Sequence, residues 1–192
     1  MECEAAPLPS HIHILGASGS GTSTLAKAIS LRHGHRFLDT DDFYWKPTDP
    51  PFQTSRPVAE RLGFLGVAMA ASPTWVLSGS LCGWGDALVE HFDLVVFLIV
   101  DRGVRLERLR LRELRRFGPE ALAPEGRHCE AHLAFMDWAA AYEHGGPDVR
   151  SRVLHESWLR TLTCPVLRLE GDLSVEERLR RLEARTPAEG GS

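Results

Sequence analysis

Short apolar runs alternate with amphipathic stretches along most of the chain. The short runs predict strands, and the stretches with apolar residues at helical spacing predict helices. Strands separated by helices are typical of a parallel sheet with right-handed crossovers. Strands are predicted at 11–15, 36–39, 75–78, 94–100 and 165–170, and helices at 21–33, 57–71, 102–117, 131–143, 147–162 and from Ser174 onward.

The segments between these elements are predicted to be loops. Residues 43–57 are rich in aromatic residues and proline, residues 79–85 form a second glycine-bearing loop, and residues 118–130 match no regular pattern. We therefore expect one α/β domain at 11–185, a tail at 1–10 and a second tail at 186–192.

Composition and charge exclude several classes of partner. The chain has 192 residues, enough for one domain with a substantial core, and a net charge of −4, which does not suggest nucleic-acid binding. The longest strongly apolar run, 94–100, is too short to span a membrane. The scattered cysteines Cys3, Cys82, Cys129 and Cys164 are expected to be reduced thiols, which indicates a cytoplasmic protein.

The stretch from His11 to Ser30 reads as a buried strand, a glycine-rich turn and a helix. Glycines in such a turn let successive backbone N–H groups point into one concavity, and the helix N-terminus adds a partial positive charge. This combination predicts a site for the phosphates of a nucleoside triphosphate. The alternative is a turn that merely joins strand to helix.

The turn fits the P-loop pattern G-x-x-x-x-G-K-[ST] with one departure. Gly16 and Gly21 are the fixed glycines, Ser23 stands at the Mg²⁺-binding hydroxyl, and Thr22 stands where the pattern has lysine. Lys27 lies five positions further on, about 140° round a helix, and is not expected to reach the same phosphate. The phosphate-binding residues are predicted to be Gly16, Ala17, Ser18, Gly19, Ser20, Gly21, Thr22, Ser23 and Thr24.

With these residues the chain resembles the P-loop nucleoside and nucleotide kinases, including adenylate and shikimate kinases. The resemblance implies a P-loop NTPase fold, a three-layer α/β/α sandwich with a five-stranded parallel sheet and a helical lid region at about 105–160. It also implies ATP and Mg²⁺ as cofactors and a small-molecule acceptor as second substrate.

Residues 37–41 resemble the F-x-D-[ST]-D segment of shikimate kinases, at the matching place after the second strand. By that resemblance Asp39 holds Mg²⁺ through water, while Asp41 binds the acceptor hydroxyl and acts as base. Carboxylate oxygen suits a hard cation, and a hydroxyl acceptor needs a nearby base. Asp42 is a further acid beside them. The alternative is that these acids cap a turn or a helix.

The resemblance to shikimate kinases weakens after the third strand. Their glycine triplet is replaced by Ser78-Gly79-Ser80, and their lid motif is not evident, so shikimate is not the expected substrate. Aromatic side chains in the neighbouring loops instead suggest a flat or apolar acceptor, unless they are core or loop anchors. The predicted acceptor-site residues are Asp42, Tyr44, Trp45, Arg56, Gly79 and Trp84.

A basic helix is predicted to supply charge to the phosphates. Arg108, Arg112 and Arg116 share one face, and nucleotide kinases place lid arginines in this region. Arg112 and Arg116 are predicted to be catalytic. One of these three arginines, or Lys46 or Arg56, is a candidate replacement for the missing lysine. The alternative is a solvated face paired with Glu107 and Glu113.

Two further signals are weaker. His128 and His132 in the sequence HCEAH have a spacing at which two histidines can share a metal, but nine histidines make chance spacing easy. Asp172 follows Gly171, at the place where the backbone of many of these kinases contacts the adenine. The alternative is a polar turn before Ser174.

The sequence therefore favours a cytoplasmic kinase that transfers the γ-phosphate of ATP to a small hydroxyl or phosphate acceptor. One alternative is a nucleotide-binding sensor or interaction module with weak or no transfer. Another is a P-loop ATPase, although the chain is short for one. A monomer or a homodimer is expected, with no nucleic-acid or membrane partner.

Overall fold

The computed structural model describes residues 8–49 and 51–185. Five parallel strands form one sheet in the order β2-β3-β1-β4-β5, with β1 at its centre. This confirms the predicted α/β class and the five-stranded parallel sheet. The strands are β1 (His11–Gly16), β2 (Arg36–Asp39), β3 (Trp75–Ser78), β4 (Leu94–Ile99) and β5 (Val166–Glu170).

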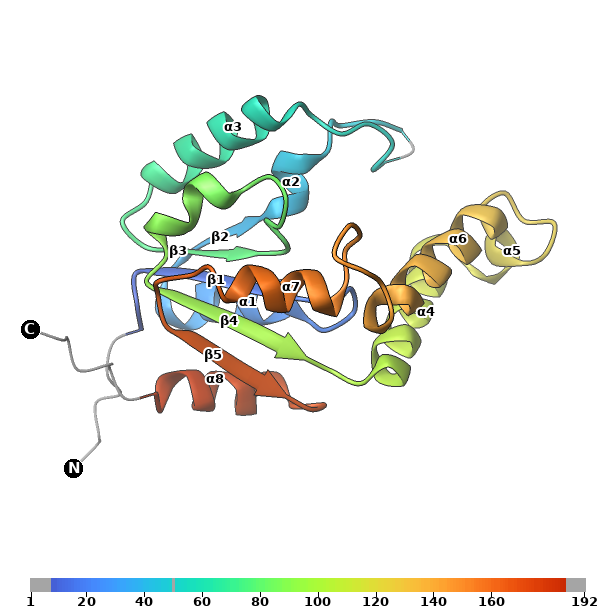
Figure 1. Cartoon of the computed structure of the whole chain (residues 1–192). Helices are drawn as coiled ribbons and strands as arrows, with labels where there is room; N and C mark the ends of the chain where they lie inside the picture. Colours follow the sequence, from blue (N-terminus) through green and yellow to red (C-terminus); the bar gives the residue numbers. More distant parts are fainter. Residues whose placement is uncertain (1–7, 50, 186–192) are drawn as a thin grey trace, which may run out of the picture.

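Helices cover both faces of the sheet and make a three-layer sandwich (Figure 1). Successive side chains of a strand point to opposite faces, so Ile12 and Ile14 pack against α1 and α8 while Leu15 packs on the face of α3 and α7. These four helices are α1 (Thr22–His33), α3 (Val58–Ala70), α7 (Arg152–Leu159) and α8 (Val175–Glu183).

The remaining helices lie at the carboxyl ends of the strands. Helices α4 (Arg102–Phe117), α5 (Pro119–Leu122) and α6 (Cys129–Ala140) project from the sheet beyond the end of β4 (Figure 1). Short 3₁₀ segments, η1 (Asp86–His91) and η2 (Ala141–Glu143), precede β4 and follow α6. Helix α7 returns to the core through Trp158 and Leu159, so the predicted lid region 105–160 includes one helix that packs on the sheet.

The turns after the strands bring the predicted polar chemistry to one edge. The glycine-rich loop follows β1, α2 (Thr40–Tyr44) follows β2, and Gly79 follows β3. Carboxyl ends of parallel strands meet at the same side of the sheet, which is where open α/β sheets bind ligands.

Two loop predictions and one helix prediction need correction. Residues 43–57 are not all loop, because Phe43 and Tyr44 end helix α2, whose first turn the Asp39 side chain caps by accepting the Asp41 N–H. Residues 118–130 contain α5 and the start of α6. The helix predicted at 147–162 begins only at Arg152, because Ser151 caps it by accepting the Leu154 N–H, and it ends at Leu159.

The predicted tail 186–192 and most of the predicted tail 1–10 lie outside the described residues. Within residues 8–49 and 51–185, no helix is long and apolar enough to cross a membrane.

Gly79, which follows β3, packs closely against Thr40 at the start of α2. Its φ is +110°, and a Cβ there would lie 1.8 Å from Thr40 Oγ1, whereas Gly34 has φ +74° with nothing within 4 Å. We expect Gly34→Ala to cost about 1–2 kcal/mol of unfolding free energy through backbone strain. Gly79→Ala adds overpacking against α2 and should cost about 2–4 kcal/mol in urea titrations. Equal losses in the two variants would contradict this packing.

Candidate phosphate and acceptor site

The loop between β1 and α1 has the backbone conformation that only glycine adopts easily. Gly19 has φ +81° and Gly21 has φ +95°. A Cβ on Gly16 would lie 2.8 Å from the Leu98 carbonyl oxygen, and one on Gly19 would lie 2.6 Å from the Arg105 carbonyl oxygen. The glycines are therefore required both by the turn and by the close approach of β4 and α4.

The same loop leaves a set of backbone donors unused. In the part of the chain that the structure describes, no hydrogen bond is made by the N–H groups of Gly19, Gly21, Thr22, Ser23 or Thr24. Gly21 is the N-cap of α1 and provides no capping side chain. Unsatisfied donors at a helix N-terminus attract anions. The loop thus fits the phosphates that the sequence predicts for it.

The carbonyl oxygens of the loop are bound by arginines from distant segments. Arg105 Nη1 donates to Ser18 O at 2.9 Å, and Arg178 Nη1 donates to Ser20 O at 2.9 Å. Arg108 Nη1 lies 3.5 Å from Gly19 O, and Arg150 Nη2 lies 3.2 Å from Gly16 O. We call Arg105, Arg108, Arg150 and Arg178 the arginine collar. It fixes the carbonyl side of the loop and adds positive charge around it.

Two collar arginines have acidic partners and two have none. Arg105 pairs with Glu143, and Arg108 pairs with Asp172. Arg150 and Arg178 form no ion pair with any described residue. Burial lowers the pKa of Arg150, and burial followed by repulsion from Arg108 lowers the pKa of Arg178. The collar therefore carries positive charge that protein carboxylates do not fully neutralise.

A hydroxyl and a carboxylate meet beside the loop as a candidate Mg²⁺ site. Ser23 Oγ donates to Asp39 Oδ2 at 2.9 Å, and Ser78 Oγ donates to the same oxygen at 3.0 Å. These are the hard oxygen donors that Mg²⁺ prefers, and Mg²⁺ is commonly held by one or two carboxylates together with phosphate and water. The residues therefore fit the ion that the P-loop pattern implies.

Asp39 also positions the second acid of the site. Its Oδ1 accepts the Asp41 N–H at 3.1 Å, so Asp39 caps helix α2, as the alternative interpretation predicted, and its role as a metal ligand stays a prediction. Desolvation raises the pKa of Asp41, the charge of Asp39 raises it further, and Arg150 lowers it. Desolvation and Asp39 also raise the pKa of Asp42. Asp41 thus holds a proton more tightly than an ordinary aspartate does.

The aromatic residues predicted for the acceptor site mostly pack on one another. Trp84 is buried, its Nε1 donates to Ser80 O at 3.2 Å, and its ring lies edge-on to Tyr44. The buried Arg61 guanidinium lies 3.7 Å from the centre of the Tyr44 ring. Trp45 contacts Tyr44 and Phe52. The arrangement favours an anchoring role for Trp84 and leaves Tyr44 and Trp45 nearer the surface.

A buried hydrogen-bonded chain reaches the acceptor side from the helical projection. Tyr142 Oη lies 2.8 Å from His155 Nδ1, and His155 Nε2 lies 3.1 Å from Ser80 Oγ. Burial, followed by the charge of Arg150, lowers the pKa of His155 to about 3. The histidine is therefore neutral at neutral pH, when one ring nitrogen donates and the other accepts. The chain fixes Ser80 directly after the Ser78–Gly79 turn.

The predicted arginine stripe divides in the structure. Arg108 reaches the loop, but Arg112 lies near Glu113 and over Phe135, and Arg116 lies over Phe52 and Phe117. Arg56 lies over the Phe64 ring. Within residues 8–49 and 51–185, no hydrogen bond or ion pair to the loop is made by Arg56, Arg112, Arg116 or Lys46. The catalytic roles of Arg112 and Arg116, the substrate role of Arg56 and the replacement of the lysine by one of these four residues stay predictions.

The histidine motif finds no support as a metal site. No group of three or more His, Cys, Asp or Glu side chains within residues 8–49 and 51–185 is arranged to hold a metal ion. The His128 ring instead packs against Phe117 at 4.3 Å between ring centres. Asp172 pairs with Arg108, so it contributes to the collar.

Sequence reasoning missed Arg61, Arg105, Arg150 and Arg178. Arg105 is fully buried on α4 beside Leu109 and Glu113, but in the sequence it is only one more arginine of a basic helix. Arg150 and Arg178 lie 134 and 158 residues from their loop partners, and no local pattern marks such contacts.

The collar makes a testable prediction for stability. Arg105→Met removes the bonds to Ser18 O and Glu143 from a fully buried side chain. We expect a loss of about 2–3 kcal/mol in unfolding free energy, measured by denaturant titration. Arg110→Met, on the same helix, breaks only the surface pair with Glu107 and should cost less than about 0.5 kcal/mol. Similar losses in both variants would count against a structural role for the Arg105 bonds.

Comparison with known proteins identifies one close sequence relative and several solved structures with a similar fold. No protein-family model matches the chain. The uncharacterized protein YqaC of Bacillus subtilis (strain 168) is 49% identical over 172 residues, which cover 90% of this chain and 94% of YqaC.

Among solved structures, a gluconokinase from Sinorhizobium meliloti 1021 is similar with a TM-score of 0.52 and 20% identity, over 93% of this chain and 92% of the gluconokinase. A shikimate kinase from Acinetobacter baumannii has a TM-score of 0.49 and 13% identity, over 90% of this chain and 89% of the kinase. At this identity the gluconokinase likeness establishes the fold, which is that of the P-loop kinases, as the sequence predicts.

Proposed function

The chain belongs to the YqaC family, and we propose that it is an ATP-dependent phosphotransferase that moves the γ-phosphate of ATP to a small hydroxyl or phosphate acceptor. The observation that carries the proposal is the placement of Asp41. Asp39 joins the Ser23 hydroxyl to the start of α2, and its other oxygen holds the backbone of Asp41. A second carboxylate thus follows directly after the candidate metal pair and is held there through its backbone.

Phosphoryl transfer requires mainly positioning and charge stabilisation. The phosphates are bound by the unused N–H groups, which are those of Gly19, Gly21, Thr22, Ser23 and Thr24, and the arginine collar holds the loop in place. Ser23 and Asp39 would hold Mg²⁺, which would neutralise charge on the phosphates. Ser78 keeps the Asp39 carboxylate oriented toward Ser23.

For a hydroxyl acceptor, Asp41 takes the hydroxyl proton. The acceptor oxygen bonds to the γ-phosphorus, the bond from that phosphorus to the β-phosphate bridging oxygen breaks, and ADP leaves with the bonding electrons. A carboxylate at this place can act as the base, because an acceptor hydroxyl has to lose its proton during transfer. For a phosphate acceptor, Asp41 orients the acceptor and no proton needs to be removed.

The neighbouring kinases support this reading through their fold alone. The similar structures are described as a gluconokinase and a shikimate kinase, and those acceptors belong to those proteins. Nucleotide binding alone does not require an acid on the acceptor side. The presence of Asp41 beside Ser23 and Asp39 therefore supports phosphoryl transfer over nucleotide binding alone.

Asp41→Asn tests this proposal against the nucleotide-sensor alternative. ADP release from Mg·ATP is measured with a panel of sugars, hydroxy acids, nucleosides and nucleotides as acceptors. We expect at least one acceptor to be phosphorylated, with a rate about 10²–10⁴-fold lower in Asp41→Asn. ATP affinity should stay within about twofold, because Asp41 forms no hydrogen bond or ion pair with residues 16–24, all of which the structure describes.

The matched control is Asp137→Asn, an exposed acid on α6, which should transfer phosphate at the wild-type rate. Transfer that survives in Asp41→Asn would remove Asp41 from the mechanism. ATP binding without transfer to any acceptor would favour the sensor.

A further inference from the structure

The loop lacks the cation that its pattern normally supplies. Thr22 stands at the lysine position, and its side chain makes no hydrogen bond with any described residue. The P-loop lysine reaches the β- and γ-phosphates of the bound nucleotide. A protein that uses this loop for transfer needs positive charge at that place from another part of the chain.

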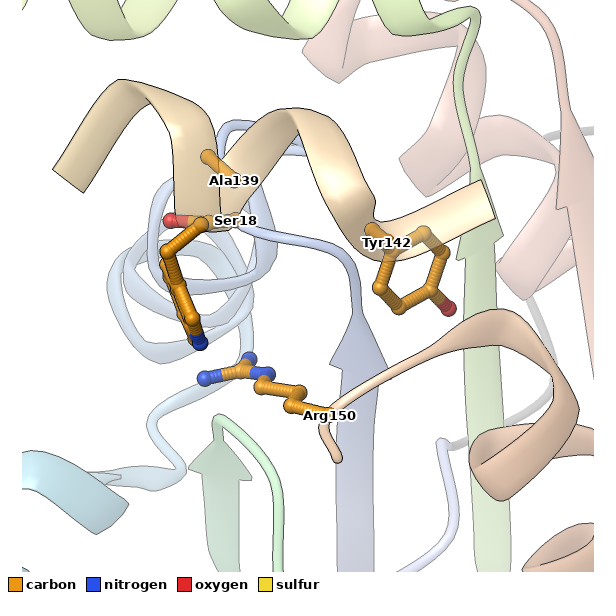
Figure 2. A pocket seen from close by; sticks show the side chains of 5 residues that line it. Ser18, Ala139, Tyr142 and Arg150 are labelled. Atoms are coloured by element: carbon orange, nitrogen blue, oxygen red, sulfur yellow. The ribbon is translucent and has the colours of Figure 1, made fainter. Parts of the chain in front are cut away.

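Arg150 reaches the loop from the segment just before α7. Its Nη2 donates to the carbonyl of Gly16, the first fixed glycine, and its Nη1 has no partner among the described residues. The Nε is buried and also unpartnered. In Figure 2 the side chain extends beside the end of β1 toward the loop that carries Ser18, in a shallow pocket also lined by Tyr142 and Ala139.

The backbone around Arg150 is fixed, so its position does not depend on a mobile loop. Ser151 is fully buried, donates to Gly146 O at 2.7 Å and caps α7. The Arg150 guanidinium lies 5.8 Å from the centre of the Trp138 ring on α6. Contacts from two elements hold the charge beside the loop before any ligand binds.

The surroundings of Arg150 separate it from the other unpaired collar arginine. The carboxylates whose charges act on Arg150 are Asp41 and Asp39, the acids of the acceptor and metal sites. The charges acting on Arg178 are those of Arg108, another collar arginine, and of its partner Asp172. Arg150 is therefore the unpaired collar arginine beside the acids of the acceptor and metal sites, whereas Arg178 comes from α8, which packs with α1 on the sheet face opposite α7.

We propose that Arg150 replaces the P-loop lysine and binds the β- and γ-phosphates of the nucleoside triphosphate through its free guanidinium nitrogens. This inference rests on the proposed function, since it assumes that the loop binds a nucleoside triphosphate. Arginine suits the task because its planar group binds two phosphate oxygens while keeping its bond to Gly16. The loop with Thr22 then still binds phosphate, because Arg150 supplies the positive charge that lysine supplies in the P-loop pattern.

A mutant cycle with calorimetry tests this exchange of cations. Mg·ATP affinity is measured for the wild type, Arg150→Met, Thr22→Lys and the double variant. We expect Arg150→Met to weaken binding at least about tenfold, the size of one lost charge-assisted bond. Thr22→Lys alone should change affinity less than about threefold, and in the double variant it should restore affinity to within about threefold of wild type.

Three controls give the cycle its specificity. Arg152→Met removes an exposed arginine that follows Ser151 and should bind Mg·ATP as the wild type does. Arg178→Met should not be rescued by Thr22→Lys, because the charges that act on Arg178 are those of Arg108 and Asp172 and not those of the acceptor and metal acids. Mg·tripolyphosphate, which has the phosphates without the base, should lose affinity in Arg150→Met by the same factor as Mg·ATP.

The outcomes separate this inference from the proposed function. A wild-type protein that fails to bind Mg·ATP overturns both. Wild-type binding that Arg150→Met leaves within twofold overturns the role of Arg150 alone. Thr22→Lys that tightens binding tenfold in the wild-type background also overturns it, and this variant decides the question even where Arg150→Met is unstable.

Discussion

The hydrogen bonds from the arginine collar to the loop carbonyls determine which way the loop presents its N–H groups. A peptide unit whose carbonyl is held on one side directs its N–H group to the other. Arg105 and Arg178 hold two of these carbonyls at 2.9 Å from buried positions. The phosphate-binding surface is therefore assembled before the ligand arrives, and little of the binding free energy is needed to order it.

The collar also connects the loop to the rest of the fold. Arg105 and Arg108 come from α4, Arg150 precedes α7 and Arg178 comes from α8, so helices on several sides of the sheet meet at one turn. Asp39 performs a similar task on the acceptor side, where one carboxylate contacts Ser23, Ser78 and the backbone of Asp41. Each of these side chains has both a structural contact and a place in the proposed chemistry.

Sequence patterns predicted the parts of this site that depend on local order. The strand, glycine turn and helix from His11 to His33 have the predicted bounds to within a residue, and Gly34 ends α1 in a left-handed conformation. The acids of 39–41 stand at the edge where they were expected. Helix α2 was missed because its five residues lie within an aromatic and acidic segment too short to show a period.

The source of positive charge could not be predicted from the sequence. An exposed stripe such as Arg108, Arg112 and Arg116 is visible as a pattern, but only Arg108 contacts the loop. Arg150 lies in a short irregular segment, and its partner Gly16 is 134 residues away. Contacts of that kind follow from the packing of α7 on the sheet, which no spacing of residues near position 150 encodes.

The loop, with Thr22 at the lysine position, is proposed to bind a nucleoside triphosphate together with Mg²⁺ held by Ser23 and Asp39. Calorimetry of ATP with the purified protein, first with Mg²⁺ and then with a chelator, measures this binding. We expect a dissociation constant of roughly 1–100 μM with Mg²⁺ and binding at least about tenfold weaker without it. Asp39→Asn should reduce that difference. No binding up to millimolar ATP, or equal affinity with and without Mg²⁺, would show that the loop is not such a site.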